Sequence, residues 1–160
     1  RHKGFQMVRP INSGFIEDQK KILKTPCAVV EDVTPDITAL ITDLIDTAQA
    51  HPGCVGLSAN QIWEDPTRPA PKVCLLPGQQ GWVVAINPQI DIKWKKELVG
   101  PEGCMSLPAY VVKKKVRAKH IQISYANEKL ERTEEAHLYE LPARIFQHEM
   151  DHLEGKLLNE

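Results

Sequence analysis

Apolar residues recur at helical spacing in a first stretch of the chain, after residue 34. The set that would share one helix face is Ile37, Leu40, Ile41, Leu44, Ile45 and Ala48. Thr34 stands where a capping hydroxyl is favoured, and Pro35 stands at the first helical position. The tripeptide His51-Pro52-Gly53 then interrupts the pattern. We therefore predict a core helix over residues 35–50.

A second helical pattern lies near the C-terminus. Its apolar set is Leu141, Ile145, Phe146, Met150 and Leu153. Gly155 follows at a place where a helix can end in the left-handed conformation. The pattern predicts a second buried helix that ends just before this glycine.

Short apolar runs of strand type fill most of the chain between the two helices. They cover residues 72–76, 82–86, 90–94, 110–116 and 121–125, with a hairpin turn at 126–129 and a proline-rich surface loop at 63–71. The pattern predicts an α+β fold, with mainly antiparallel β-sheets packed around the central helix near the C-terminus.

That C-terminal helix carries the sequence His148-Glu149-Met150-Asp151-His152. Residues four apart lie on one helix face, so the two histidines can bind one divalent cation while Glu149 reaches a water molecule on it. The alternative interpretation is a surface helix with two histidines by chance. The apolar flanks favour a buried helix, and the motif predicts a metallohydrolase.

A catalytic metal site of this kind needs a third protein ligand. Eight residues follow His152 in this chain, so we expect that ligand upstream and disfavour the HExxH peptidase layouts that take it from downstream. The upstream candidates are Cys27, Cys54, Cys74, Cys104, His2, His51, His120 and His137. Cys104 stands out because it lies in the turn-rich segment 101–108. Taken alone, a cysteine between Gly and Met is more often a buried packing residue.

Three separated motifs together resemble the peptide deformylase family. They are Cys-Val-Gly-Leu-Ser-Ala-Asn-Gln at 54–61, Glu-Gly-Cys-Met-Ser at 102–106 and Gln-His-Glu-Met-Asp-His-Leu-Glu-Gly at 147–155. Their order and spacing are typical of that family, and the similarity covers about residues 22–155.

The resemblance implies one divalent metal ion held by Cys104, His148 and His152. Iron(II) is the expected ion in the cell, and zinc, nickel or cobalt can occupy the same site. The implied reaction removes the N-formyl group from the N-terminal formyl-methionine of new polypeptides and releases formate. Glu149 would move the water proton. The Gln61 amide and the Met105 N–H would stabilise the charge that develops on the formyl oxygen.

Substrate contacts are expected on both sides of this centre. Family analogy places the peptide as an added strand against Val55, Gly56 and Gly103. Leu141 and Ile145 precede the metal ligands by helical steps and are predicted to form the methionine pocket.

Arg144 lies one turn before His148 on the same face. It is either a cation near the cleft, touching the peptide or a carboxylate such as Glu102, or a charge on the helix surface. We give it as a candidate substrate-binding residue.

The chain departs from the family pattern at three positions. Cys54 stands where glycine is most common, Ser58 where alanine is common and Met105 where leucine is common. None of these changes removes a catalytic group. Cys54 could narrow the cleft or bring a second thiol toward the metal, although a buried packing cysteine is the commoner situation.

Composition limits the number of domains and the kinds of partner that the chain can have. The 160 residues are 42% hydrophobic with a formal net charge of -1, which suits one globular domain and gives no general attraction to nucleic acid. We expect an N-terminal extension at 1–19 and one catalytic domain at 20–160. The basic run 113–119 is interpreted as a solvated strand edge, with transient ribosome proximity as the alternative.

Four cysteines without a Cys-x-x-Cys pair indicate a reducing compartment, and no stretch is apolar enough to predict a membrane span. We expect a cytoplasmic protein. A mitochondrial or plastid location is the alternative, because the first twelve residues are basic and could be the remnant of a targeting segment.

Three functional hypotheses follow. The leading one is a deformylase acting on N-formyl-methionyl nascent peptides. The second is an HExxH metallopeptidase of unusual layout. The third is a metal-binding homologue that acts on a different acyl substrate.

Overall fold

The structure is a computed structural model, and it describes residues 6–160. Its elements are α1 (Glu17–Leu23), α2 (Pro35–Ala50), β1 (Leu57–Ser58), the 3-10 turn η1 (Ala59–Gln61), β2 (Val73–Gly78), β3 (Gly81–Lys93), β4 (Glu97–Cys104), β5 (Leu107–Ala118), β6 (His120–Ala126), β7 (Ala136–Tyr139) and α3 (Glu140–Leu153). The expected α+β class is confirmed.

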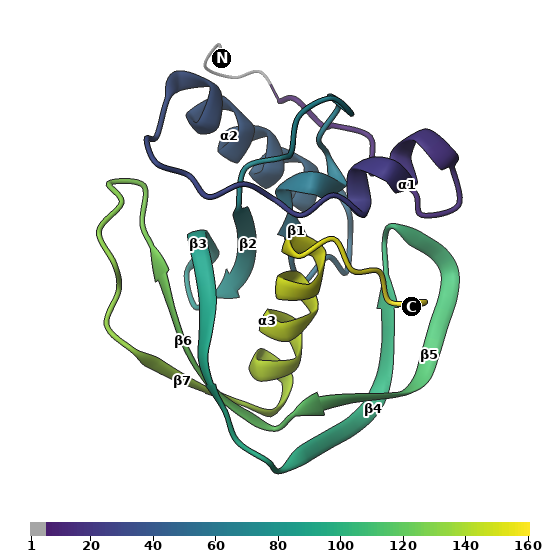
Figure 1. Cartoon of the computed structure of the whole chain (residues 1–160), viewed down its shortest axis with the longest axis vertical. Helices are drawn as coiled ribbons and strands as arrows, with labels where there is room; N and C mark the ends of the chain where they lie inside the picture. Colours follow the sequence, from purple (N-terminus) through teal and green to yellow (C-terminus); the bar gives the residue numbers. More distant parts are fainter. Residues whose placement is uncertain (1–5) are drawn as a thin grey trace.

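The strands form two antiparallel sheets on either side of α3. One sheet has the order β1-β2-β3-β6-β7, and the other is the hairpin β4-β5. Figure 1 shows α3 running between them, and α3 contacts strands of both sheets. Residues 148–152, which carry the histidine motif, therefore lie on a helix enclosed by sheet on two sides.

The predicted first helix is present as α2. The Thr34 hydroxyl accepts a hydrogen bond from the Ile37 N–H at 3.3 Å, so the expected cap forms. Leu44 and Ala48 pack in a buried cluster with residues of β1 and β2, among them Leu57 and Leu75. The apolar face of α2 thus packs beside the short segment β1-η1.

The predicted second helix is present as α3. Phe146, Met150 and Leu153 are buried in a cluster with β2 and β6. Beyond its end, Gly155 has φ +77°, and a Cβ there would lie 2.5 Å from the Lys24 carbonyl oxygen. Only glycine fits this position, which fixes where the chain leaves the helix.

Two strand predictions need correction. Residues 82–86 and 90–94 belong mainly to one strand, β3, whose pairing with β6 shifts register between Ile86 and Gln89. Asn87 lies in this irregularity with φ 49°. Its side-chain amide accepts a hydrogen bond from the Val30 N–H and donates one to the Val30 carbonyl. These two hydrogen bonds stabilise an irregularity in the middle of β3. The sequence pattern is interrupted at this irregularity, which is why it predicted two strands and not one.

The segment 101–108 was expected to be turn-rich, but much of it is strand. Gly100, Pro101 and Gly103 lie within β4, whose pairing with β5 shifts register twice. Glycine and proline therefore mark bulges here and not a loop. Cys104 is the last residue of β4. The loop at 63–71 and the turn at 126–129 are present as predicted.

The described part of the N-terminal segment lies against the domain. The Asn12 N–H donates to the Gln61 carbonyl at 2.7 Å, and the Gly14 N–H donates to the Ser106 carbonyl at 2.7 Å. The domain boundary at residue 19 stays a prediction, and the first five residues, including His2, lie outside the described residues. Within 6–160, no helix combines the length and apolar character that a bilayer crossing requires.

Candidate metal centre and active site

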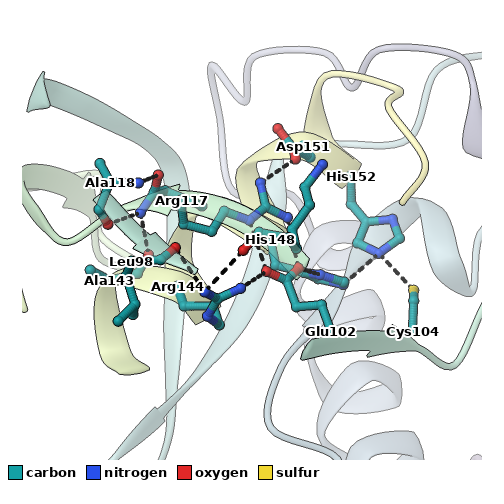
Figure 2. A network of polar contacts seen from close by, with 12 residues as sticks. Leu98, Glu102, Cys104, Arg117, Ala118, Ala143, Arg144, His148, Asp151 and His152 are labelled. Carbon is teal, nitrogen blue, oxygen red and sulfur yellow. Dashed lines mark hydrogen bonds and ion pairs between the residues drawn. The ribbon is translucent and has the colours of Figure 1, made fainter. Parts of the chain in front are cut away.

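Three of the predicted ligands converge between α3 and the end of β4. The Cys104 Sγ lies 3.1 Å from the His152 Nε2, which lies 3.2 Å from the His148 Nε2. Figure 2 shows the thiol and the two rings facing one another. Among residues 6–160 this is the one group of three or more Cys, His, Asp or Glu side chains that meets the spacing of a metal site. The other candidate ligands within residues 6–160 do not belong to this group.

The donor spacing fits a divalent metal ion. Bond lengths of about 2.0–2.1 Å to nitrogen and 2.3 Å to sulfur place tetrahedral ligand atoms about 3.3–3.6 Å apart. The Sγ–Nε2 and Nε2–Nε2 separations in this structure are a few tenths of an ångström shorter. One thiolate and two imidazoles supply three ligands and leave a fourth position for water or substrate, as in catalytic sites.

Glu102 orients one of the rings. Its carboxylate accepts from the His148 Nδ1 at 2.8 Å, which leaves the Nε2 atom directed at the other ligands. The same carboxylate accepts from Arg117 at 2.7 and 2.9 Å and from Arg144 at 2.6 Å. Burial opposes ionisation of Glu102, but the hydrogen bonds from Arg117 and His148 leave its pKa well below the usual value. Glu102 is therefore an anion at neutral pH.

The two arginines connect α3 to the hairpin β4-β5. Arg144 also donates to the carbonyls of Leu98 and Lys115 at 3.0 and 3.2 Å and is 7% exposed, so it is not a surface charge. Of its expected partners, the structure shows Glu102. Arg117 bridges Glu102 and Asp151 (Figure 2).

The sequence pattern does not distinguish Arg117, because it lies in the basic run 113–119, where every neighbour but Val116 and Ala118 is a lysine. Lys113 and Lys114 are exposed as predicted, but Arg117 is buried. Arg117 differs from the lysines of the run only because the fold brings its side chain to Glu102.

Glu149 lies beside the ligand cluster with unused hydrogen-bonding capacity. It is 3% exposed, and its Oε1 has no hydrogen-bond partner among the described residues. Burial raises its pKa to about 7. A Cβ on Gly56 would lie 2.7 Å from the Glu149 Oε2, so the glycine leaves room for this carboxylate. Such a group can exchange a proton near neutral pH.

The two ligand histidines differ in their environments. Burial lowers the pKa of His152 far below the usual value, so its ring is neutral. Burial also acts to lower the pKa of His148, but contacts with Cys104 and Glu102 raise it to about 10. Metal binding would replace the proton that such a cluster shares, because ligand nitrogens and sulfur must be deprotonated.

The Gln61 side chain is held with its amide nitrogen toward the cluster. Its Oε1 accepts from the Ser58 N–H at 3.0 Å, which fixes the rotation of the amide. Its Nε2 donates to the Ser106 hydroxyl at 3.0 Å and lies 3.8 Å from the Cys104 Sγ. The neighbouring Asn60 donates to the His152 carbonyl at 2.6 Å and so ties η1 to α3. Asn60 and Ser106 lie within the sequence motifs, but no feature of the sequence alone marks them as parts of the site.

An open cleft of about 730 Å³ leads to this centre. Of the predicted site residues, those that line it are Val55, Gly56, Gln61, Gly103, Cys104, Met105, Leu141, Arg144, Ile145, His148 and Glu149. His152 is buried beneath it. Leu141 and Val55 are more than half exposed.

Cys54 does not line the cleft. Its Sγ lies 3.3 Å from the Gly56 carbonyl oxygen and donates to it, and the side chain packs against the cluster that contains α2. The packing interpretation therefore describes Cys54 better than a second thiol directed at a metal.

Comparison with known proteins assigns the family. The family model described as polypeptide deformylase matches residues 13–160. The chain belongs to the polypeptide deformylase family. A peptide deformylase from Roseiflexus castenholzii is 36% identical over 156 residues, covering 89% of this chain and 82% of the relative. One from Syntrophobacter fumaroxidans is 34% identical over 136 residues, covering 85% and 78%.

Solved deformylases share the fold. The enzyme from Thermotoga maritima superposes with a TM-score of 0.81 at 30% identity and 97% coverage of both chains. A class I type b enzyme from Acinetobacter baumannii, bound to Met-Ala-Ser, gives 0.80 at 26% identity, with 95% and 97% coverage. The chain is thus a peptide deformylase, a metal-dependent hydrolase that removes the N-formyl group from nascent polypeptides. The peptidase hypothesis is set aside.

Proposed function

We propose that the Cys104 Sγ and the Nε2 atoms of His148 and His152 bind one divalent metal ion in this deformylase. The convergence of these three donors, with His148 oriented by Glu102, carries the proposal. When bound, the ion supplies a Lewis acid and lowers the pKa of a water ligand. Fe2+ is the proposed ion in the cell, and Zn2+, Ni2+ or Co2+ could occupy the same site.

Glu149 is the proposed general base and acid. Its carboxylate accepts the proton of the attacking water and later delivers it to the leaving amine. A pKa of about 7 and an unpaired Oε1 in a buried site both suit this exchange. Gly56 has no Cβ and so leaves room for this carboxylate in the cleft.

Gln61 and Met105 are proposed to stabilise the transition state. Negative charge develops on the formyl oxygen, and the Gln61 amide and the Met105 backbone N–H would donate to it. The bonds from Ser58 and to Ser106 hold the Gln61 amide in place before substrate arrives. Loss of one such donor costs on the order of a hundredfold in rate.

The peptide is proposed to lie as an added strand along Val55, Gly56 and Gly103, with the methionine side chain against Leu141 and Ile145. All five residues line the same cleft. The Acinetobacter baumannii relative has been solved with Met-Ala-Ser bound, which supports a peptide ligand for this chain as well. Arg144 would act from the wall of the pocket as a positioning residue, because its hydrogen bonds go to Glu102 and to two carbonyls.

The proposed cellular setting is a reducing compartment where formylated nascent chains emerge. A cytoplasmic site with transient ribosome proximity fits this substrate, and a mitochondrion or plastid is the alternative. Fractionation of the source cells, with the protein followed by antibody, decides between these locations.

The ligand set can be tested with two serine substitutions. We expect Cys104→Ser to lower metal retention during dialysis and to remove the sulfur scatterer from the X-ray absorption spectrum of the zinc-loaded protein. Cys54→Ser is the matched control, because its thiol bonds a backbone carbonyl and should leave both readouts unchanged. A sulfur ligand that persists in Cys104→Ser would refute the assignment.

A further inference from the structure

A second cluster of metal-binding side chains lies outside the active cleft, on the five-stranded sheet. His120 begins β6, His137 lies in β7, and both side chains fall on the same face because His120 pairs with Tyr139 and Gln122 pairs with His137. Neither histidine lines the cleft that leads to Glu149.

The two imidazoles meet edge to edge. The His120 Nε2 and the His137 Nδ1 form an N–H···N hydrogen bond of 2.7 Å, in which one nitrogen carries the proton and the other accepts it. Nitrogen ligands about 2.0 Å from a metal ion are about 2.8 Å apart at square-planar angles and about 3.3 Å apart at tetrahedral angles. The observed separation is therefore close to that of neighbouring ligands on a square-planar ion.

Stacked aromatic rings fix the orientation of His120. Trp94 stacks on it with 3.7 Å between ring centroids and 2° between planes, and Tyr139 stacks at 4.2 Å and 19°. The backbone N–H of Trp94 also donates a hydrogen bond to the His120 carbonyl at 3.1 Å, which holds the tryptophan beside β6. Trp94, just after β3, and Tyr139 of β7 thus hold the imidazole in one orientation, so binding a metal there would cost little further ordering.

Charge does not prevent ligation at this position. Desolvation and the neighbouring His137 lower the pKa of His120, so its ring is neutral at neutral pH. A metal ion would release the proton that the two facing nitrogens share and bind their lone pairs in its place. The adjacent Lys119 is the nearest cation in sequence, and it forms an ion pair with Glu140 at 3.3 Å.

We propose that His120 and His137 form a second metal site, on the protein surface, for a divalent transition-metal ion that favours square-planar nitrogen ligands, such as Cu(II) or Ni(II). The site is independent of the catalytic centre in position and in ligand type, because it contains no thiolate. Water would complete the coordination.

Copper titration of nickel-loaded enzyme tests the site. Near neutral pH we expect one equivalent of Cu(II) to bind per chain, with nitrogen hyperfine structure in the EPR spectrum and no release of nickel. Removing a residue that only hydrogen-bonds a metal ligand lowers metal affinity about 10–100-fold. His137→Gln removes a proposed ligand itself, so it should weaken copper binding at least about tenfold. Gln122→Ala keeps both imidazoles and should bind copper as the wild type does.

Tryptophan fluorescence gives a second readout. Copper beside the Trp94–His120 stack should quench the emission of Trp94, and Trp94→Phe should lose that quenching while retaining the EPR signal. Deformylase activity of each variant at the wild-type level shows that it is folded. Nickel released in proportion to copper bound, absence of bound copper, or equal affinity in His137→Gln would each overturn the proposal.

Discussion

Two glutamates close to the same histidine have opposite protonation behaviour because of their neighbours. Glu102 receives hydrogen bonds from two arginines and from His148, so its pKa falls despite burial. Glu149 is buried with Oε1 unpaired, and burial raises its pKa to about 7. Carboxylates with pKa values pushed apart in this way commonly divide the roles of a site. Here one residue orients a ligand and the other can move a proton.

Gly56 also determines where the Glu149 carboxylate can lie. We predict that Gly56→Ala lowers kcat strongly while the protein still folds, because the new Cβ would lie 2.7 Å from the Glu149 Oε2 and would displace that carboxylate. Gly100→Ala is the control, since its Cβ would meet Arg144 at an ordinary 3.5 Å. Steady-state kinetics and circular dichroism give the comparison. Equal kcat in Gly56→Ala and wild type would show that Glu149 is not confined as described.

At the scale of elements, the Glu102 network joins three of them. The carboxylate on β4 accepts hydrogen bonds from Arg117 of β5 and from both Arg144 and His148 of α3, so it fixes the hairpin and the helix, which carry the proposed metal ligands, relative to each other. Removing one partner of a buried ion pair leaves the others uncompensated, which costs more than a surface pair contributes.

We therefore predict that Glu102→Gln destabilises the protein by about 3 kcal/mol at neutral pH. The folded-state pKa of Glu102 is depressed, so its contribution is present above the unfolded value of about 4.3 and is lost as pH falls through the folded value. Urea unfolding at several pH values should show the difference from wild type shrinking on acidification. Glu97→Gln, at an exposed position of the same strand, is the control. A difference that grew toward acid would contradict this sign.

At the scale of the whole molecule, helix periodicity located α2 and α3, and the motifs singled out the three side chains that converge as the proposed metal ligands. The sequence did not reveal β4, because Gly100, Pro101 and Gly103 are typical of turns and only pairing with β5 shows them to be a bulged strand. Arg117 was also missed, because its distinction from the neighbouring lysines depends on a partner fifteen residues away.

The N-terminal segment is the other feature that sequence alone treated as peripheral. The Asn12 side chain donates to the carbonyls of Asn60 and Trp63, each at 2.8 Å. We predict that Asn12→Ala lowers the free energy of unfolding by about 1–3 kcal/mol, because one buried and one part-buried carbonyl lose their donor. Phe15→Ala, at a position 58% exposed, is the control. Identical urea midpoints for Asn12→Ala and wild type would mean that this segment is only an appendage.

The central claim is that Glu149 acts on a substrate bound beside a metal held by Cys104, His148 and His152. The most direct test is formate release from a formyl-Met-Ala-Ser peptide by nickel-loaded wild type and Glu149→Gln, with metal content measured on the same samples. We predict one metal ion per chain in both proteins and a rate at least about a hundredfold lower in the variant. An acetyl-Met peptide should release nothing. Wild-type turnover by Glu149→Gln with metal bound would contradict the account.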